Sequence, residues 1–295
     1  MISVENVTKT FDGFKALDSV DLLAPKGVVY GLVGSNGAGK TTLIRHLAGI
    51  YHQDSGQVSI DGQSVFENNN IKQRTGLIPD EIYFYPQSST YDMAKFLSGI
   101  YPKFSWDYYK ELADAFPIDE KRPIRKMSRG MQKQSAFRLA IACRYDFLLL
   151  DEPVDGLDPV MRRTVWKLLL KDVADNGTTV VISSHNLREL EDVCDHVGIM
   201  HKGRIILERS LSELQSGVYK INAAFDKELP DEIPGLKELH RSKTGKLFTL
   251  IIRGDSIDAN KILADYSPTF FDVLPLTLEE IFIYELGGED YGSIL

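Results

Sequence analysis

The chain has 295 residues, of which 43% are hydrophobic, and its formal net charge at pH 7 is −8. This length suits one large domain, or a large and a small one, with enough apolar residues for a sizeable core. The acidic balance argues against a general nucleic-acid binder, because such proteins rely on lysine and arginine at the phosphates. No nucleic-acid partner is therefore expected.

The first part of the chain reads as strands around one loop and one helix. Residues 27–34 are apolar and β-branched, which is typical of a strand buried on both faces. A glycine-rich loop follows, and the apolar spacing then predicts a helix over 40–51. The remaining segments with strand-like patterns are 2–7, 16–25, 56–65 and 74–81.

The middle of the chain alternates between helices and buried strands. Apolar residues at helical spacing predict a helical insert over about 90–126 and a long helix over 129–145. Buried strands are expected at 147–153 and 178–185, helices at 159–177 and 186–195, and a hairpin at 196–210 with Lys202-Gly203 at its turn. Buried strands that alternate with helices imply parallel pairing and a layered α/β fold.

The character changes after about residue 217. Strands are expected at 219–225, 246–254 and 269–274, and helices at 256–266 and 276–286. We therefore expect a first domain over 1–216, with a helical subdomain at about 82–145, and a small accessory α+β domain over 217–295.

Neither the cysteines nor the N-terminus suggests an extracellular or membrane-spanning chain. Cys143 and Cys194 stand in apolar helical contexts, which favours buried free thiols over a disulfide or zinc site and fits a reducing cytosol. No signal peptide is evident in the first residues. No window approaches the ~20 apolar residues of a spanning helix, so work at a membrane would need a second chain to cross it.

Residues 34–41, GSNGAGKT, fit the phosphate-binding pattern G-x-x-x-x-G-K-[ST] position for position. Glycines let backbone N–H groups converge on one point, and the helix that follows adds its positive end. Lys40 would reach the β- and γ-phosphates, and the Thr41 hydroxyl is placed for Mg²⁺. The loop therefore predicts a nucleoside triphosphate site.

Two carboxylates close a buried strand further along the chain. Asp151 and Glu152 follow the apolar run FLLL, and alternation points them to opposite sides of the strand. Adjacent buried carboxylates are costly unless they meet a cation or move a proton. Asp151 suits the metal, and Glu152 suits a general base for water. His185 ends the next buried strand and shares its edge with them.

With these motifs in place, the chain resembles the ATP-binding subunit of ABC transporters over about residues 1–215. The residues that carry the resemblance beyond the phosphate loop are MSRGMQ at 127–132, LLLDEP at 148–153, DGLD at 155–158 and SSH at 183–185. Their order and approximate spacing follow the family. The variants in these motifs look most like the bacterial ABC-2 exporter, antibiotic-resistance and YtrB-like type.

The resemblance implies the fold of this family. This is a P-loop NTPase of ABC ATPase type, with a mixed sheet core, an antiparallel β subdomain and a helical subdomain, followed here by the small C-terminal α+β domain. It also implies a head-to-tail dimer in which ATP lies between the phosphate loop of one subunit and MSRGM of the other. Ser128 stands where the long helix begins, so it suits an ordinary N-cap, a γ-phosphate contact, or both.

The resemblance assigns a role to each matching residue. Phe11 stands where an aromatic side chain stacks on adenine, and Asp158 matches the acidic residue that bridges the two subunits. Glu152 acts on water, His185 contacts the γ-phosphate, and Asp151 supports Mg²⁺. The residues expected to hold nucleotide are Phe11, Gly34, Ser35, Asn36, Gly37, Ala38, Gly39, Lys40, Thr41, Thr42, Ser128, Arg129 and Gly130.

Three positions depart from the family pattern. Asp80 stands where a glutamine is usual after GLIP; it can still ligate Mg²⁺ or orient water, so it joins the expected catalytic and metal-binding residues. Arg129 replaces a glycine of the common LSGGQ and can reach phosphate or ribose, and Asp155 replaces a usual serine. Since Lys40, Glu152 and His185 are retained, we expect hydrolysis.

We therefore expect an ATP-hydrolysing subunit that powers a membrane exporter through ATP-driven dimerisation. It would pair with a like or unlike ATP-binding subunit and with a separate transmembrane permease, as a peripheral protein on the cytoplasmic face of the cell membrane. Tyr83, Phe84 and Tyr85 would either border the permease-docking groove or pack inside the helical subdomain.

The alternative is a soluble ABC ATPase that acts on a non-membrane partner. The ribosomal type has two such cassettes in one chain, and this chain has one. The DNA-repair type carries a long coiled-coil insert, and no such heptads are present. A non-hydrolysing regulator would not need Glu152 and His185.

Overall fold

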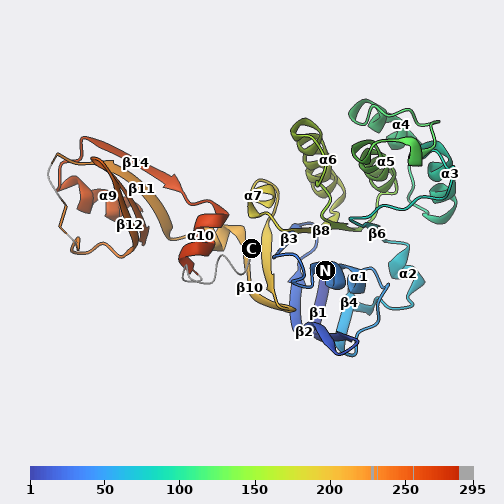
Figure 1. Cartoon of the computed structure of the whole chain (residues 1–295), viewed down its shortest axis with the longest axis horizontal. Coiled ribbons are helices and arrows are strands. Elements are labelled where there is room, and N and C mark those ends of the chain that lie inside the picture. Colours follow the sequence, from blue (N-terminus) through green and yellow to red (C-terminus); the bar gives the residue numbers. More distant parts are fainter. Residues whose placement is uncertain (227–228, 231, 255, 286–295) are drawn as a thin grey trace. The chain divides into compact units, whose positions relative to one another are not determined.

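The structure is a computed structural model that describes residues 1–226, 229–230, 232–254 and 256–285 (Figure 1). The chain forms two compact units, one over Met1–Glu208 and the other beginning at Arg209. The functional division between residues 216 and 217 stays a prediction, because compactness alone does not define a functional domain. No helix in the described ranges is both long and apolar enough to cross a membrane.

The first unit is built from strands and helices in alternation. Its strands are β1 (Ile2–Phe11), β2 (Phe14–Ala24), β3 (Val29–Val33), β4 (Ser55–Ile60), β5 (Gln63–Ser64), β6 (Thr75–Ile78), β7 (Phe147–Asp151), β8 (Thr179–Ser184), β9 (His196–His201) and β10 (Arg204–Ser210), which runs past the unit boundary. Its helices are α1 (Lys40–Leu47), α2 (Asn69–Lys72), α3 (Thr90–Ile100), α4 (Trp106–Ala115), the 3₁₀ helix η1 (Ile124–Lys126), α5 (Arg129–Ala142), α6 (Pro159–Asn176) and α7 (Leu187–Leu190).

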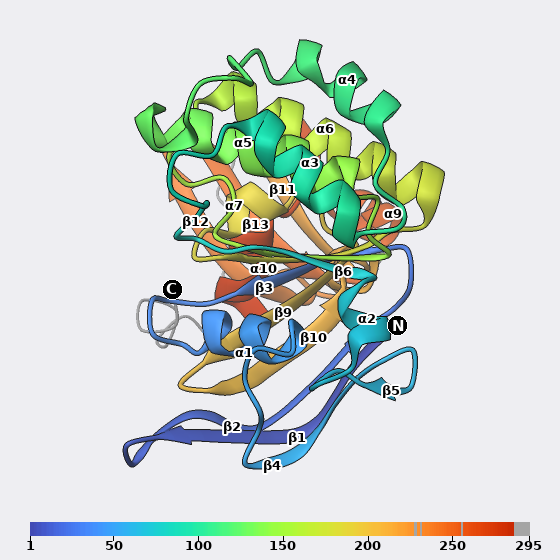
Figure 2. The ribbon, with the colours of Figure 1, turned by 90° about the vertical axis from the view of Figure 1, so that its right-hand side faces the viewer.

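These elements form layers around one large sheet. That sheet has the order β10-β9-β3-β8-β7-β6, and β9, β3, β8, β7 and β6 pair in parallel. A second sheet, β2-β1-β4-β5, is antiparallel. Helix α1 lies between the two sheets, and α3, α4, α5 and α6 lie on the other side of the large sheet (Figure 2).

The core between the sheets explains why α1 holds its place. Leu43, Ile44 and Leu47 are fully buried in one cluster with apolar residues of both sheets. Each such side chain contributes about 1.5–3 kcal/mol through its burial. The phosphate loop leads directly into α1, so the buried apolar side chains of this helix also fix the position of the loop.

The predicted α/β fold with parallel strands is confirmed, and two predicted helices are shorter than expected. The helix predicted over 40–51 ends at Leu47, because Gly49 adopts a positive φ of 65° and turns the chain. The helix predicted over 186–195 is reduced to α7. Asp195 bonds Val29 at the start of β3 through its backbone N–H and its carboxylate, at 2.8 Å each, so the chain turns toward the sheet instead of continuing the helix.

The second unit has its own sheet and core. Its elements are α8 (Leu211–Gln215), β11 (Val218–Ala224), β12 (Glu238–Thr244), β13 (Leu247–Arg253), α9 (Ser256–Ala264), β14 (Phe270–Pro275) and α10 (Leu278–Glu285). The sheet order is β12-β13-β11-β14 with antiparallel pairs, and Ile221, Leu250 and Leu263 are fully buried between sheet and helices. Strand β12 was not expected, because its sequence ELHRSKT is polar on both faces and it lies at the sheet edge.

Both cysteines are free and buried, as expected from the sequence. The Cys194 thiol lies against Gly31 of β3, where an added Cβ would come within 2.8 Å of Sγ. Burial raises the pKa of Cys143 to about 12, and burial also raises the pKa of Cys194. The thiols are packing groups rather than nucleophiles.

Candidate active site

The predicted site residues gather at one edge of the large sheet. Because β3, β6, β7 and β8 are parallel, their carboxyl ends open on the same side. The phosphate loop follows β3, and Asp80 follows β6. Asp151 ends β7 and His185 follows β8, so four separate segments of the sequence converge at this edge.

The phosphate loop occupies residues 34–39, between β3 and α1. Gly37 and Gly39 adopt φ of 83° and 111°, which favours glycine at both positions. Gly34 lies so close to β9 that a Cβ there would stand 2.2 Å from the Met200 carbonyl oxygen. Gly39 caps α1 without a side-chain hydrogen bond, so the first N–H groups of the helix remain available for an anion.

Lys40 is buried at the centre of this loop, with 5% of its side chain exposed. Its Nζ donates to the carbonyl oxygens of Gly34 at 2.6 Å and Ser35 at 3.2 Å. It also lies 3.3 Å from Glu152 Oε1. The lysine thus joins the phosphate loop to the carboxylate at the end of β7.

Asp151 lies beside Thr41 and is almost fully buried. Its Oδ1 accepts a hydrogen bond from the Thr41 hydroxyl at 3.1 Å and another from the Ser183 hydroxyl at 2.6 Å. A threonine hydroxyl next to a carboxylate offers the hard oxygen ligands that Mg²⁺ prefers. Ser183 was not singled out from the sequence, although its place in SSH at the end of β8 was a usable signal.

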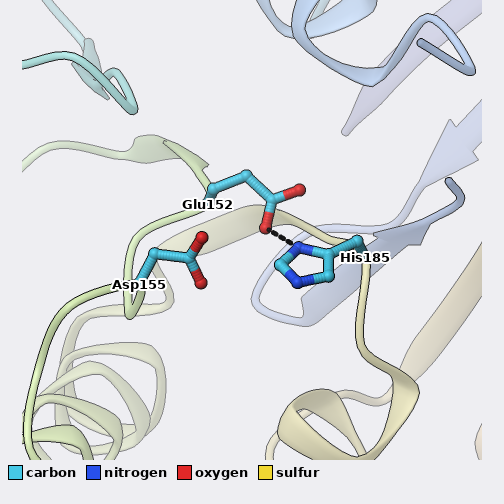
Figure 3. A group of neighbouring side chains, drawn as sticks. All are labelled: Glu152, Asp155 and His185. Carbon is cyan, nitrogen blue, oxygen red and sulfur yellow. Dashed lines mark hydrogen bonds and ion pairs between the residues drawn. The ribbon is translucent and has the colours of Figure 1, made fainter. Parts of the chain in front are cut away.

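Glu152 and His185 face each other across the ends of β7 and β8 (Figure 3). Glu152 Oε2 lies 3.0 Å from His185 Nδ1, and the Glu152 N–H donates to the Ser183 hydroxyl at 3.0 Å. Glu152 has a φ of 46°, a conformation that a non-glycine residue adopts rarely. Asp155 completes the group, since one ligand atom from each of Glu152, Asp155 and His185 lies within 4.8 Å of the others.

A buried lysine that was not singled out from the sequence also reaches the site. Lys133 of α5 is 7% exposed, and its Nζ donates to the main-chain oxygen of Glu152 at 2.9 Å. Burial lowers the pKa of Lys133, although nearby carboxylates, Asp80 first among them, oppose that shift. Desolvation raises the pKa of Asp80, with Lys133 opposing. These residues line one cavity of about 660 Å³ together with Glu81, Ile82, Tyr83, Arg129, Gln132, Asp155 and Gly156.

The signature residues lie at the start of α5. Ser128 is its N-cap, and its hydroxyl accepts a hydrogen bond from the Met131 N–H at 3.3 Å. Arg129 is exposed, and a Cβ at Gly130 would lie 3.5 Å from the Gly156 carbonyl oxygen. Asp158 similarly caps α6, accepting hydrogen bonds from two backbone N–H groups. The N-cap interpretation of Ser128 is confirmed, and its phosphate contact stays a prediction.

Phe11 lies at the turn between β1 and β2, with 37% of the residue exposed. Its ring packs edge-on against Tyr51 at 5.4 Å between centroids, and the Lys9 ammonium lies 5.4 Å from the ring centre. Thr42 lies in the first turn of α1, where its carbonyl oxygen lies 2.7 Å from His46 Nδ1. In the interactions described, neither Phe11 nor Ser128 contacts the group formed by Lys40, Glu152 and His185.

Comparison with known proteins gives one consistent result. Residues 17–155 match the family model described as ABC transporter. The chain is 33% identical to the ABC transporter ATP-binding protein YtrB of Bacillus subtilis (strain 168), over 98% of this chain and 99% of the relative. It is 30% identical to the bacitracin transport ATP-binding protein BcrA of Bacillus licheniformis, over 99% of each. A solved structure of an ATP-binding subunit of an ABC transporter superposes with a TM-score of 0.68 at 23% identity, covering 73% of this chain and 92% of that one.

Proposed function

Because this chain belongs to the ATP-binding proteins of ABC transporters and is an ATPase of that family, we propose that it hydrolyses Mg²⁺-bound ATP to power a membrane exporter. The observation that carries the proposal is the meeting of Lys40, Glu152 and His185 beside the phosphate loop. It combines a cation for phosphate, a carboxylate that can accept a proton from water, and an imidazole that orients that carboxylate.

In this proposal each group has a defined role. Lys40 and the free N–H groups of α1 hold the β- and γ-phosphates. Glu152 accepts the proton of the attacking water, and His185 both orients its carboxylate and contacts the γ-phosphate. Mg²⁺ would be held by Thr41 and Asp151, and Asp80, which follows β6, would be a further ligand. When bound, this ion neutralises charge on the phosphate oxygens.

The proposal includes a head-to-tail dimer with a like or unlike ATP-binding subunit. Ser128, Arg129 and Gly130 stand at the N-terminal end of α5, where backbone N–H groups and the helix dipole attract an anion. The exposed Arg129 adds a positive charge there. This end of the helix suits the γ-phosphate of a nucleotide held by the partner, with Phe11 stacked on the adenine of the subunit's own nucleotide.

A groove on the helical subdomain supports a separate transmembrane permease as the second partner. A cavity of about 620 Å³ is bounded by Ile82, Tyr83 and Phe84 on one side and by α3 and α5 on another. Tyr83 is 83% exposed, whereas the Tyr85 ring packs against Phe96 at 5.2 Å. An exposed aromatic beside an apolar groove is typical of a protein interface. The permease would hold this chain at the cytoplasmic face of the membrane.

The transport direction is proposed from the relatives. BcrA is named for bacitracin transport, and it matches this chain along its full length. We infer that this system likewise transports a compound, that the direction is out of the cell, and that the permease selects the cargo.

Co-purification tests this proposal against the soluble alternative. The tagged chain is isolated from gently solubilised membranes of its native cell, and a stoichiometric polytopic partner is expected. Recovery from the soluble fraction alone, with a ribosomal or assembly partner, would overturn the exporter assignment and leave the ATP site intact. The Lys40→Ala chain serves as the control. It should still co-purify with the permease, because permease binding and nucleotide binding use different surfaces.

A further inference from the structure

A buried ammonium from the helical subdomain holds the backbone of the proposed catalytic carboxylate. Lys133 projects from α5, is 7% exposed, and donates to the Glu152 carbonyl oxygen at 2.9 Å. A buried lysine is costly unless it is paired and hydrogen-bonded. None of the roles assigned so far uses this cation.

Glu152 is held by other contacts that all come from the sheet edge and the phosphate loop. Its N–H donates to Ser183, and its carboxylate meets His185 and Lys40. The backbone at Glu152 is in the left-handed region, with a φ of 46°. Such a conformation persists when surrounding contacts fix it. Among the interactions described, the bond to Lys133 connects the helical subdomain to this residue.

The charges around Lys133 explain why an ammonium is stable there. The carboxylates of Asp80, Asp155, Glu152 and Asp151 all favour its charged form, in that order, against the cost of burial. Asp80 and Asp155 line the same cavity as Lys133. The cation thus partly balances an edge that is rich in negative charge, and its hydrogen bond to Glu152 is charge-assisted.

We propose that Lys133 is a positioning residue that fixes the Glu152 backbone. Through this contact, the position of the helical subdomain affects the orientation of the Glu152 carboxylate. The proposal rests on the proposed function, in which Glu152 acts on water. A shift of α5 relative to the sheet moves Lys133 and changes the Glu152 conformation. Movement of the subdomain that carries the permease groove is thereby transmitted to hydrolysis.

The test compares Lys133→Met, Lys133→Gln and Lys133→Arg in the full chain. Loss of a hydrogen bond from a charged donor predicts a fall in kcat of about tenfold or more in the Met variant. The KM for ATP should stay within about twofold, because the phosphate loop is unchanged. The Gln variant keeps a donor without the charge and should fall between Met and wild type, and Arg should restore most of the activity. Lys110→Gln, on the exposed face of α4, is the matched control.

Hydrogen exchange gives a readout that does not depend on activity. The Lys133→Met chain should exchange faster in the peptide covering 150–158, while the peptides of α6 and β13 stay unchanged. Wild-type kcat and wild-type exchange in all three variants would overturn the proposal. A uniform rise in exchange along α5, with kcat and KM impaired together and no rescue by Arg, would reduce Lys133 to a structural role. A wild-type chain that binds no ATP would instead refute the proposed function, and the exchange data would still test the Lys133 contact.

Discussion

The Lys40 ammonium lies 3.3 Å from Glu152 Oε1, so the proposed phosphate-binding cation and the proposed general base are paired with each other. Both side chains are shielded, with 5% and 12% exposed. A γ-phosphate and the Glu152 carboxylate are both anions, and they would compete for the same ammonium. We infer that nucleotide binding draws Lys40 away from Glu152 and releases the carboxylate for water.

Glu152→Gln should separate binding from hydrolysis. The amide cannot accept the proton from water, so kcat is expected to fall by about 10²–10⁴-fold. ATP affinity should be equal to or greater than that of wild type, because the anion that competes for Lys40 is gone. Steady-state ATPase assays and equilibrium binding of ATP measure the two effects, and ATP should bring the variant to a dimer in size-exclusion chromatography. Unchanged turnover would remove Glu152 from the role of base.

Lys40→Ala should abolish nucleotide binding itself. The variant loses the cation that faces the phosphates, whereas Lys15→Ala, a lysine paired with Asp18 on the exposed hairpin, should bind ATP normally. Affinities for ATP from calorimetry compare the two, with thermal unfolding as a check on folding. Full affinity in Lys40→Ala would contradict the phosphate-loop interpretation.

Gly34→Ala should damage the loop by steric conflict alone. The added methyl would stand 2.2 Å from the Met200 carbonyl oxygen, so β9 or the loop has to move, and both ATP binding and stability should fall. Gly13→Ala provides the comparison: its φ is also positive, at 83°, but nothing lies within 4 Å of the new Cβ. That control should lose about 1 kcal/mol of stability and keep its ATP affinity. Equal behaviour of the two variants would count against the close approach of Gly34 to β9.

Asp146→Asn should lower stability in a pH-dependent way. Burial alone would raise the pKa of Asp146, but hydrogen bonds from Lys103 and Arg74 lower it below its usual value. The stabilisation is therefore present above the unfolded-state pKa of about 3.9 and is lost as pH falls through the lower folded-state pKa. In urea unfolding, the gap of about 1 kcal/mol between wild type and variant at pH 7 should narrow by pH 3.

Asp107 is the control for this measurement, because its side chain is 94% exposed whereas that of Asp146 is 28% exposed. Asp107→Asn should lose at most about 0.5 kcal/mol at pH 7, because its ion pair with Lys110 in the first turn of α4 is exposed. A gap for Asp146→Asn that stayed constant between pH 7 and pH 3 would show that packing, rather than ionisation, accounts for its effect.

Tyr83→Ala should weaken binding of the permease without changing the stability or ATP affinity of the chain. The ring is 83% exposed, so its removal should leave the unfolding midpoint and ATP affinity unchanged. Recovery of the co-purifying permease should fall if Tyr83 borders the docking groove. Phe96→Ala is the comparison on the same subdomain, since that ring supports Tyr85 and its loss should lower stability as well. Undiminished permease recovery with Tyr83→Ala would move the docking surface elsewhere.

The site residues that could be predicted from the sequence are those that belong to short continuous motifs or stand at the end of a buried strand. The spacing of Gly34, Gly39 and Lys40 predicts a phosphate-binding loop within one continuous stretch of sequence. The structure has this loop between β3 and α1. Asp151 and His185 were predicted because each follows an apolar run that is typical of a buried strand. The contacts of Asp151 with Thr41 and of His185 with Glu152 follow from parallel pairing, which the apolar runs of β7 and β8 already imply.

Other contacts depend on side chains that are distant in sequence and carry no local signal. Lys133 is one polar residue in an ordinary helix, and only the packing of α5 against the end of β7 directs it to the Glu152 carbonyl. The end of α7 is set by Asp195 bonding Val29, a contact across 166 residues. Strand β12 exists because β13 offers it an edge, although its own residues have no apolar alternation.

The burial of both cysteines has a practical consequence. Since the thiols of Cys143 and Cys194 are covered and their pKa values are raised, alkylating reagents should reach them only when the fold opens. The native cysteines should therefore contribute little background when a spectroscopic label is attached to an introduced cysteine. A single cysteine introduced at Tyr83 or Lys110 could carry a spin or fluorescent probe without prior removal of native thiols, and slow labelling of Cys194 in the same sample would count unfolding events.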